Sequence, residues 1–261
     1  NVYHYYVGSK YFSELGYFGL YAATLAADDA FQVEKQKAKG KEAKRLKKVR
    51  DFKELKKARD MRDYLVKPRK EIVASFSEFE MSDARLKQLG EDTRFLRTFM
   101  GIKSPGWSNT LQDLGYNPGP AWTLIGVPMT NLIPPKWPYF HLISNSDVPL
   151  FVFTFLLLWW GFGLRVASAM VLWTCTIQFN ESRFAGGFLQ YDWFASTLMC
   201  AALYRRGWYR SAGLALSWGA MTRVFPGFLI LPFVLYAGRG AWRGLRSGQG
   251  GPARRIWYGV K

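Results

Sequence analysis

The stretch SAGLALSWGAMTRVFPGFLILPFVLY, from Ser211 to Tyr236, decides how the second half of this 261-residue chain folds. Its single charged residue is Arg223, in the middle. An arginine at the centre of a straight membrane-spanning helix costs roughly 3 kcal/mol on insertion scales. Pro226 removes a backbone donor and disfavours helical geometry at the preceding residue. The pattern therefore predicts two short helices, about 12 residues before Arg223 and about 11 after Pro226, which form a hairpin with Arg223 at its tip.

Each predicted helix of this hairpin is too short to cross a bilayer. At 1.5 Å per residue it extends about 18 Å, against a hydrocarbon core of about 30 Å. The tip then lies partway through the membrane, or in a thinned one, close to water and lipid headgroups. There the planar fork of Arg223 suits a phosphate. The alternative is that residues 149–178 and 211–236 form two long tilted helices.

Charge and apolar residues are segregated along the chain. Overall the sequence is 49% apolar and 17% aromatic, with 11 Trp, yet its net charge is +17. Residues 31–70 hold 17 Lys or Arg and 6 Asp or Glu, whereas the long apolar runs fall within 149–237. We therefore expect an all-α, polytopic helical membrane protein with short paired helices. Its expected parts are an extracytoplasmic and interfacial helical region (1–148), membrane helices (149–237) and a basic cytoplasmic tail (238–261).

The basic loops predict the orientation of the membrane helices. Short loops rich in Lys and Arg remain cytoplasmic. Loops 205–210 and 239–246 are both basic, and both are cytoplasmic if 211–236 is a hairpin. Counting backwards from them places Arg165 inside, and it places the 179–190 loop, Arg223 and residues 1–148 outside.

The N-terminal region divides into an aromatic part and a basic part. Residues 3–30 are rich in Tyr and Phe at helical spacing, which predicts helices lying on the outer membrane surface. Residues 32–65 are predicted as one charged helix, either simply solvated or attracted to anionic lipid headgroups. Nothing resembling a nucleic-acid-binding module accompanies this charge, so nucleic acid is excluded as a partner. Residues 122–133 are a candidate for a further short membrane helix.

Few residues are candidates for chemistry. Glu14, and Asp28 beside Asp29, can each act as a general base on a hydroxyl, or simply cap helices and be solvated. Asp192, at the start of an apolar helix, can cap that helix or pair with Arg183 or Arg223. Neither His4 nor His141 stands in metal-ligand spacing, and the nucleophile-elbow, Walker and dinucleotide-binding motifs are absent. Cys175 and Cys200 lie in apolar runs and are expected to be buried thiols.

Several of these segments resemble the helical-hairpin section of GT-C superfamily membrane glycosyltransferases. The matching residues are GGFLQYDW (186–193), Arg205-Arg206-Gly, Ala212-Gly213-Leu214 and TRVFP (222–226). The opening YHYYVGSKYFSELGYFGLY (3–21) resembles the first outer loop of such enzymes. The resemblance is to the polyprenyl-phosphate-mannose-dependent mannosyltransferases, and the chain is expected to be a processed product or a fragment of a longer enzyme.

The resemblance implies transfer of a sugar from a polyprenyl-phosphate donor at the outer membrane face. Arg223, helped by Arg183, would bind the lipid phosphate, with Asp192 and Lys10 in supporting positions. The base would be Glu14, Asp28 or a residue upstream of Asn1. A divalent metal requirement is left open, and no cofactor besides the lipid donor is implied. The lysine-rich segment 31–70 departs from the family pattern. A second hypothesis is therefore a non-catalytic subunit of a larger membrane complex, in contact with membrane lipid.

Overall fold

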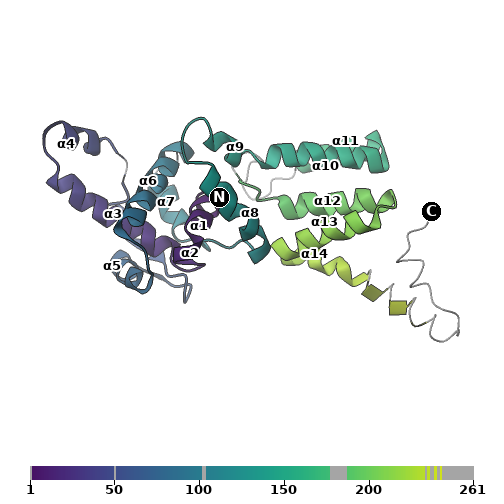
Figure 1. Ribbon diagram of the computed structural model, residues 1–261, viewed down its shortest axis with the longest axis horizontal. Helices are drawn as coiled ribbons and strands as arrows, with labels where there is room; N and C mark the ends of the chain where they lie inside the picture. The colour runs from purple at the N-terminus through teal and green to yellow at the C-terminus, as the bar shows by residue number, and fades with distance from the viewer. Residues whose placement is uncertain are drawn as a thin grey trace. The chain divides into compact units, whose positions relative to one another are not determined.

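The computed structural model describes residues 2–49, 51–101, 104–176, 187–232, 234–235, 238–239 and 242. These residues are mostly helical and divide into two compact units (Figure 1). Unit 1 comprises residues 1–149 and 178–190, and unit 2 comprises residues 150–177 and 191–261. Of the segment 178–190, the structure describes residues 187–190. The expectation of a helical protein is confirmed; the described residues add one small two-stranded antiparallel sheet.

Unit 1 is built around aromatic side chains. Its largest fully buried side chains include Trp107, Trp122, Tyr3, Tyr6 and Phe140. Edge-to-face contacts join several of them, such as Tyr6 to Phe140 at 5.0 Å between ring centroids. In chain order its elements are α1 (Val2–Lys10), α2 (Phe12–Leu15), α3 (Leu20–Lys37), α4 (Gly40–Lys47), β1 (Lys57–Arg59), β2 (Val66–Pro68), α5 (Arg69–Ala74), the 3-10 helix η1 (Ser75–Glu78), α6 (Asp83–Met100), α7 (Ser104–Thr110), α8 (Pro120–Leu132) and α9 (Phe140–Ser144).

Helix α1 is the central helix of unit 1, and all nine of its residues are buried. The prediction that it lies on a membrane surface is therefore wrong, since protein covers it on every side. Small residues make this possible: a Cβ on Gly8 would lie 2.3 Å from the Tyr116 ring, and one on Gly126 of α8 would lie 2.7 Å from the Ser9 hydroxyl. The segment 122–133, left open as a membrane helix, is α8, which packs against α1 in this core.

The basic segment 32–65 is not one helix. Helix α3 ends at Lys37, Gly40 has φ +59°, and α4 ends at Lys47. After it, β1 pairs with β2 in antiparallel register, with Ala58 opposite Lys67. The link between the strands turns because Asp60 and Asp63 accept hydrogen bonds from backbone amides two residues on. The charge pattern predicted helix because it contains no information about these turns.

Unit 2 consists of short helices joined by tight breaks: α10 (Asp147–Phe162), which begins in unit 1, α11 (Leu164–Thr176), α12 (Asp192–Arg205), α13 (Tyr209–Thr222) and α14 (Val224–Phe228). Gly163 (φ +88°) separates α10 from α11, and Gly207 (φ +79°) lies between α12 and α13. Arg223 is extended, with φ −146° and ψ 143°, between α13 and α14. The described helices of unit 2 are thus short, as predicted, and the breaks at Gly163 and Arg223 exclude the alternative of two long helices. The second helix of the predicted hairpin differs from the expectation, because α14 begins before Pro226 and has five residues instead of about 11.

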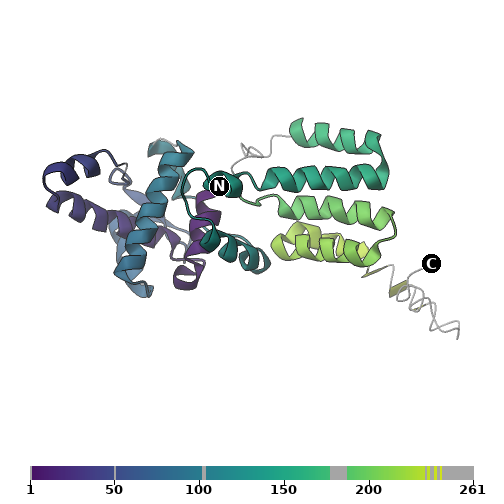
Figure 2. The same cartoon turned by 45° about the horizontal axis from the view of Figure 1, so that its top comes forward.

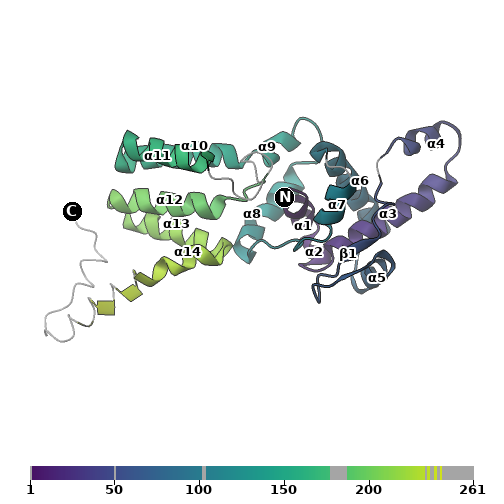
Figure 3. The ribbon, with the colours of Figure 1, turned by 180° about the vertical axis from the view of Figure 1, so that it is seen from behind.

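The helices of unit 2 lie side by side (Figures 2 and 3). Leu158 of α10, Ala167 of α11 and Ala202 of α12 form one buried cluster, and Cys200, Ala212 and Leu216 form another between α12 and α13. Many other apolar side chains face outward, among them Leu156, Trp159, Leu172, Leu214 and Phe225. Cys175 is also exposed, contrary to the expectation of a buried thiol, because it lies on an outward face of α11. Within the described residues, no helix combines the length with the apolar character needed to cross a membrane.

Candidate functional site

One end of the α12–α13 pair carries a buried carboxylate. Asp192, the first residue of α12, is only 6% exposed, and its Oδ2 accepts a hydrogen bond from the Trp218 indole of α13 at 2.8 Å. Its Oδ1 accepts from the Trp193 amide at 2.7 Å. The helices approach closely here because Gly219 has no side chain: a Cβ would lie 2.7 Å from the Ser196 hydroxyl. Asp192 therefore begins the helix, as expected, but Tyr191 holds the cap position.

Arg223 lies at the same end, where α13 stops and α14 starts. Its amide donates to the Gly219 carbonyl at 2.9 Å, and its side chain is half-buried. The backbone then leaves the helix for one residue, and Pro226 falls in the first turn of α14. A proline is tolerated in a first turn because that amide has no helical partner to lose. The structure thus places a planar cation at a helix break, at the same end of the α12–α13 pair as Asp192 and Trp218.

The other end of the α12–α13 pair is basic and aromatic. Arg206 donates to the Trp160 carbonyl at 2.7 Å, and its guanidinium lies 5.0 Å from the centre of the Trp160 ring. Trp208 meets that ring edge-on, and Arg205 and Arg210 are exposed nearby in the chain. Tryptophan and arginine together are typical of a membrane–water interface on the cytoplasmic side.

In unit 1, Glu14 is bound by an arginine. Its Oε1 accepts from Arg85 Nε at 2.7 Å and its Oε2 accepts from the Ser13 hydroxyl at 2.5 Å. Partial burial alone would raise the pKa of the Glu14 carboxyl, but the hydrogen bonds from Arg85 and Ser13 lower it below its ordinary value. A carboxylate with a lowered pKa is a weaker general base. Glu14 nevertheless keeps 19% of its side chain exposed.

Asp28 has a structural role in unit 1. It is 1% exposed; its Oδ1 accepts from the Phe52 amide at 2.9 Å, and its Oδ2 pairs with Arg69 at 2.8 Å. Asp29, exposed, shares the same guanidinium at 2.6 Å. These contacts fasten α3 to the start of α5, so Asp28 has no access to an acceptor hydroxyl. The structure thus opposes the hypothesis that Asp28 is the base.

Lys10 pairs with a carboxylate of α6. Its ammonium lies 2.5 Å from Asp92 Oδ2, with both side chains 8% exposed, and the Tyr11 hydroxyl donates to the same oxygen at 2.8 Å. Burial and the neighbouring Asp92 raise the pKa of Tyr11 far above its ordinary value. Arg85 stacks on the Tyr11 ring at 4.4 Å and donates to the Lys10 carbonyl, so Lys10 and Glu14 belong to one network.

The structure therefore groups the predicted residues in three places. Asp192 and Arg223 share one end of α12–α13, Lys10 and Glu14 share the Arg85 network, and Asp28 lies with Arg69. Arg183 falls outside the described residues. The histidines are structural: His4 Nε2 contacts the Tyr21 hydroxyl at 2.8 Å, and His141 packs on Trp137. Among the described residues, no group of His, Cys, Asp and Glu could hold a metal ion.

The sequence did not reveal Arg85, Arg69, Asp92 or Trp218 as partners. The Lys10–Asp92 pair spans 82 residues and the Arg85–Glu14 pair 71, so no local spacing signals either one. Only a weak sequence signal pointed to Trp218, namely its position about one helical turn before Thr222 and Arg223. Comparison with models of protein families, with curated proteins and with solved structures gives no match.

Proposed function

We propose that this protein is an integral membrane glycosyltransferase of the GT-C type, which transfers a sugar from a polyprenyl-phosphate donor at the outer membrane face. The observation that carries the proposal is Arg223, half-buried at the break between α13 and α14 and at the same end of the α12–α13 pair as Asp192 and Trp218. A guanidinium offers five donors in a planar fork suited to a phosphate.

The proposed membrane placement rests on unit 2. Its helices are short and paired, their outer faces are apolar, and one end combines Trp160 and Trp208 with Arg206. Placing that end at the cytoplasmic surface puts Arg223 toward the outer face and residues 1–148 on the extracytoplasmic side. Helices of 13 to 16 residues then require a locally thinned membrane or partial insertion.

In the proposed reaction the bond from the sugar to the lipid phosphate breaks. Arg223 binds the phosphate and stabilises the negative charge that develops on it as it leaves. A carboxylate takes the proton from the acceptor hydroxyl that attacks the sugar. Of the two bases considered from the sequence, Glu14 is the one with access to solvent, and it would have to leave Arg85 before it accepts a proton.

Substitution of Arg223 tests this proposal. The full chain is reconstituted in liposomes with a radiolabelled polyprenyl-phosphate mannose, and transfer is measured for Arg223→Ala and for Arg210→Ala. Arg210 is an exposed arginine in the first turn of α13 and serves as the matched control. We expect a loss of roughly 10²- to 10³-fold in Arg223→Ala, typical of removing one charge-stabilising group, and little change in Arg210→Ala. Full activity in an inserted Arg223→Ala protein would refute the assignment.

A second candidate function is that of a non-catalytic subunit of a membrane complex. The observation that favours it is that both carboxylates considered as bases are already bound to arginines, Glu14 to Arg85 and Asp28 to Arg69. In that case the wild-type chain transfers no sugar from any polyprenyl-phosphate donor and co-purifies with a larger assembly. A monodisperse, active chain in detergent would exclude it.

A further inference from the structure

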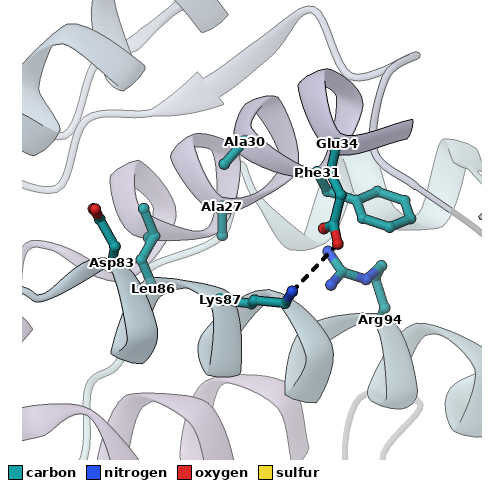
Figure 4. Close-up of a pocket in the computed structure, with 8 residues that line it drawn as sticks. All are labelled: Ala27, Ala30, Phe31, Glu34, Asp83, Leu86, Lys87 and Arg94. Carbon is teal, nitrogen blue, oxygen red and sulfur yellow. Dashed lines mark hydrogen bonds and ion pairs between the residues drawn. The ribbon is translucent and has the colours of Figure 1, made fainter. Parts of the chain in front are cut away.

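A pocket of about 220 Å³ lies in unit 1 between α3 and α6 (Figure 4). Ala27, Ala30, Phe31 and Leu86 provide its apolar surface. Its charged residues are Glu34, Asp83, Lys87 and Arg94. An engineered apolar cavity of about 150 Å³ already accommodates benzene, so this pocket has room for a small organic molecule.

Arg94 is the unusual residue of this pocket. Its guanidinium stacks on the Phe31 ring at 4.0 Å, and among the described residues it has no hydrogen-bond acceptor and no carboxylate partner. The other arginines around this core, Arg59, Arg62, Arg69, Arg85 and Arg97, each donate to a carbonyl or carboxylate oxygen. Burial lowers the pKa of Arg94, but an arginine keeps its charge at neutral pH.

The position of the guanidinium follows from Gly90. Side chains of a helix lean toward its N-terminus, so Arg94 lies back over the residue one turn earlier. A Cβ on Gly90 would lie 3.0 Å from Arg94 Nη1 and 3.2 Å from the Ala27 Cβ. The glycine therefore leaves the space in which the guanidinium lies against Phe31, which covers one of its faces.

The charges of the pocket are unevenly distributed. Lys87 pairs with Glu34 at 3.2 Å, so these two charges offset each other. Asp83 stands in the first turn of α6, where the helix dipole favours an acid. It is 11 residues from Arg94, about 16 Å along the helix, and Figure 4 places the two at opposite ends. The carboxylates of Asp28, Glu91, Glu34 and Asp51 act on Arg94 through space, yet among the described residues none accepts a hydrogen bond from it, so its donors remain available to an acceptor.

We propose that this pocket binds a small organic carboxylate, with the carboxylate on the edge of Arg94 and a short hydrocarbon group against Ala27, Ala30 and Leu86. A carboxylate matches the guanidinium fork and supplies the acceptor that Arg94 lacks. The site lies within unit 1 and is independent of the proposed glycosyl transfer.

The proposal is tested with the full chain in detergent by calorimetric titration of hexanoate, hexanol and inorganic phosphate. We expect hexanoate to bind measurably better than hexanol, which lacks the charge, and than phosphate, which lacks the hydrocarbon group. Arg94→Met keeps the apolar stem and should weaken hexanoate binding roughly 10- to 100-fold, the value of charge-assisted hydrogen bonds, while hexanol binding stays unchanged. Arg45→Met, at a residue exposed on α4, is the control and should bind as wild type.

Hydrogen exchange of the wild-type chain locates the ligand without any substitution. Hexanoate should slow exchange in peptides covering 27–34 and 83–94. The thermal midpoint of Arg94→Met should fall only slightly, because the variant loses the stacking of the guanidinium on Phe31 but no hydrogen bond or ion pair. Absence of hexanoate binding, equal binding of hexanol, unchanged binding in Arg94→Met, or protection elsewhere in the chain would each overturn the proposal.

Discussion

Replacing Lys10 by Met tests whether the pair between α1 and α6 is structural. The substitution keeps a side chain of similar length but leaves the Asp92 carboxylate, 8% exposed, with a hydrogen bond from the Tyr11 hydroxyl and without its ammonium partner. Removing one partner of a buried ion pair typically costs about 3–5 kcal/mol, because the remaining charge stays buried without compensation. Each 1.4 kcal/mol is a factor of ten, so local opening should become roughly two to four orders of magnitude more frequent.

Hydrogen exchange measures this opening segment by segment. Peptides covering residues 2–15 and 83–100 report on α1 and α6, and those covering α12 and α13 report on unit 2. We expect faster exchange in the first set and no change in the second. The double variant Lys10→Met with Asp92→Asn removes both charges and keeps an acceptor for Tyr11, so it should recover all but about 1–2 kcal/mol.

A small effect of the single variant would contradict this reasoning. If Lys10→Met changes the opening free energy by less than about 1 kcal/mol, the pair behaves as a solvated surface pair. If instead the variant unfolds no faster but loses sugar transfer, Lys10 belongs to the functional machinery, as the sequence first suggested.

Two further predictions concern His4 and Trp218. Burial lowers the pKa of His4 from 6.5 to about 4, so the unfolded chain takes up a proton first as the pH falls, and the free energy of unfolding decreases between pH 6.5 and 4 by up to about 3 kcal/mol. Urea unfolding at pH 7.5 and at pH 4.5 should show a smaller decrease in the free energy of unfolding for His4→Gln than for wild type. An identical pH dependence of the two proteins would refute this. Trp218→Phe keeps a ring but removes the indole donor to Asp192, which should cost about 1–3 kcal/mol and lower the thermal midpoint, whereas Trp208→Phe, at an exposed residue, should not.

The sequence predicted best where the deciding signal is local. Arg223 and Pro226 lie three residues apart, and together they predicted the end of α13 at Thr222, whereas α14 begins at Val224 and contains Pro226 in its first turn. The break at Gly163 is equally local, since a glycine between two apolar runs ends one helix and starts the next. The same reasoning gave a wrong prediction for the basic segment 32–65. The regular spacing of its charges predicted one helix, but turns at Gly40 and Asp60 interrupt the segment.

The partners of the candidate residues could not be predicted because they depend on packing. Glu14 and Asp28 looked like accessible acids, yet arginines from α6 and α5 occupy them across 71 and 41 residues. An aromatic, weakly charged helix such as α1 is compatible with a membrane surface and with a protein core, and its own pattern does not distinguish the two. The deciding residues, Gly8 and Gly126, matter only once α1 and α8 cross.

The burial of α1 has a consequence during synthesis. The Tyr6 hydroxyl donates to the Thr130 carbonyl across 124 residues, so the partner helix α8 is made long after α1. At roughly 5–20 residues per second, the ribosome needs about 6 to 25 s to add that length of chain. During that time the tyrosine-rich helix α1 lacks the partner against which its apolar side chains are buried. Protection of this helix from aggregation therefore depends on the factors that shield nascent chains. A pause in translation between α1 and α8 would increase the risk of aggregation more than a pause at any later codon.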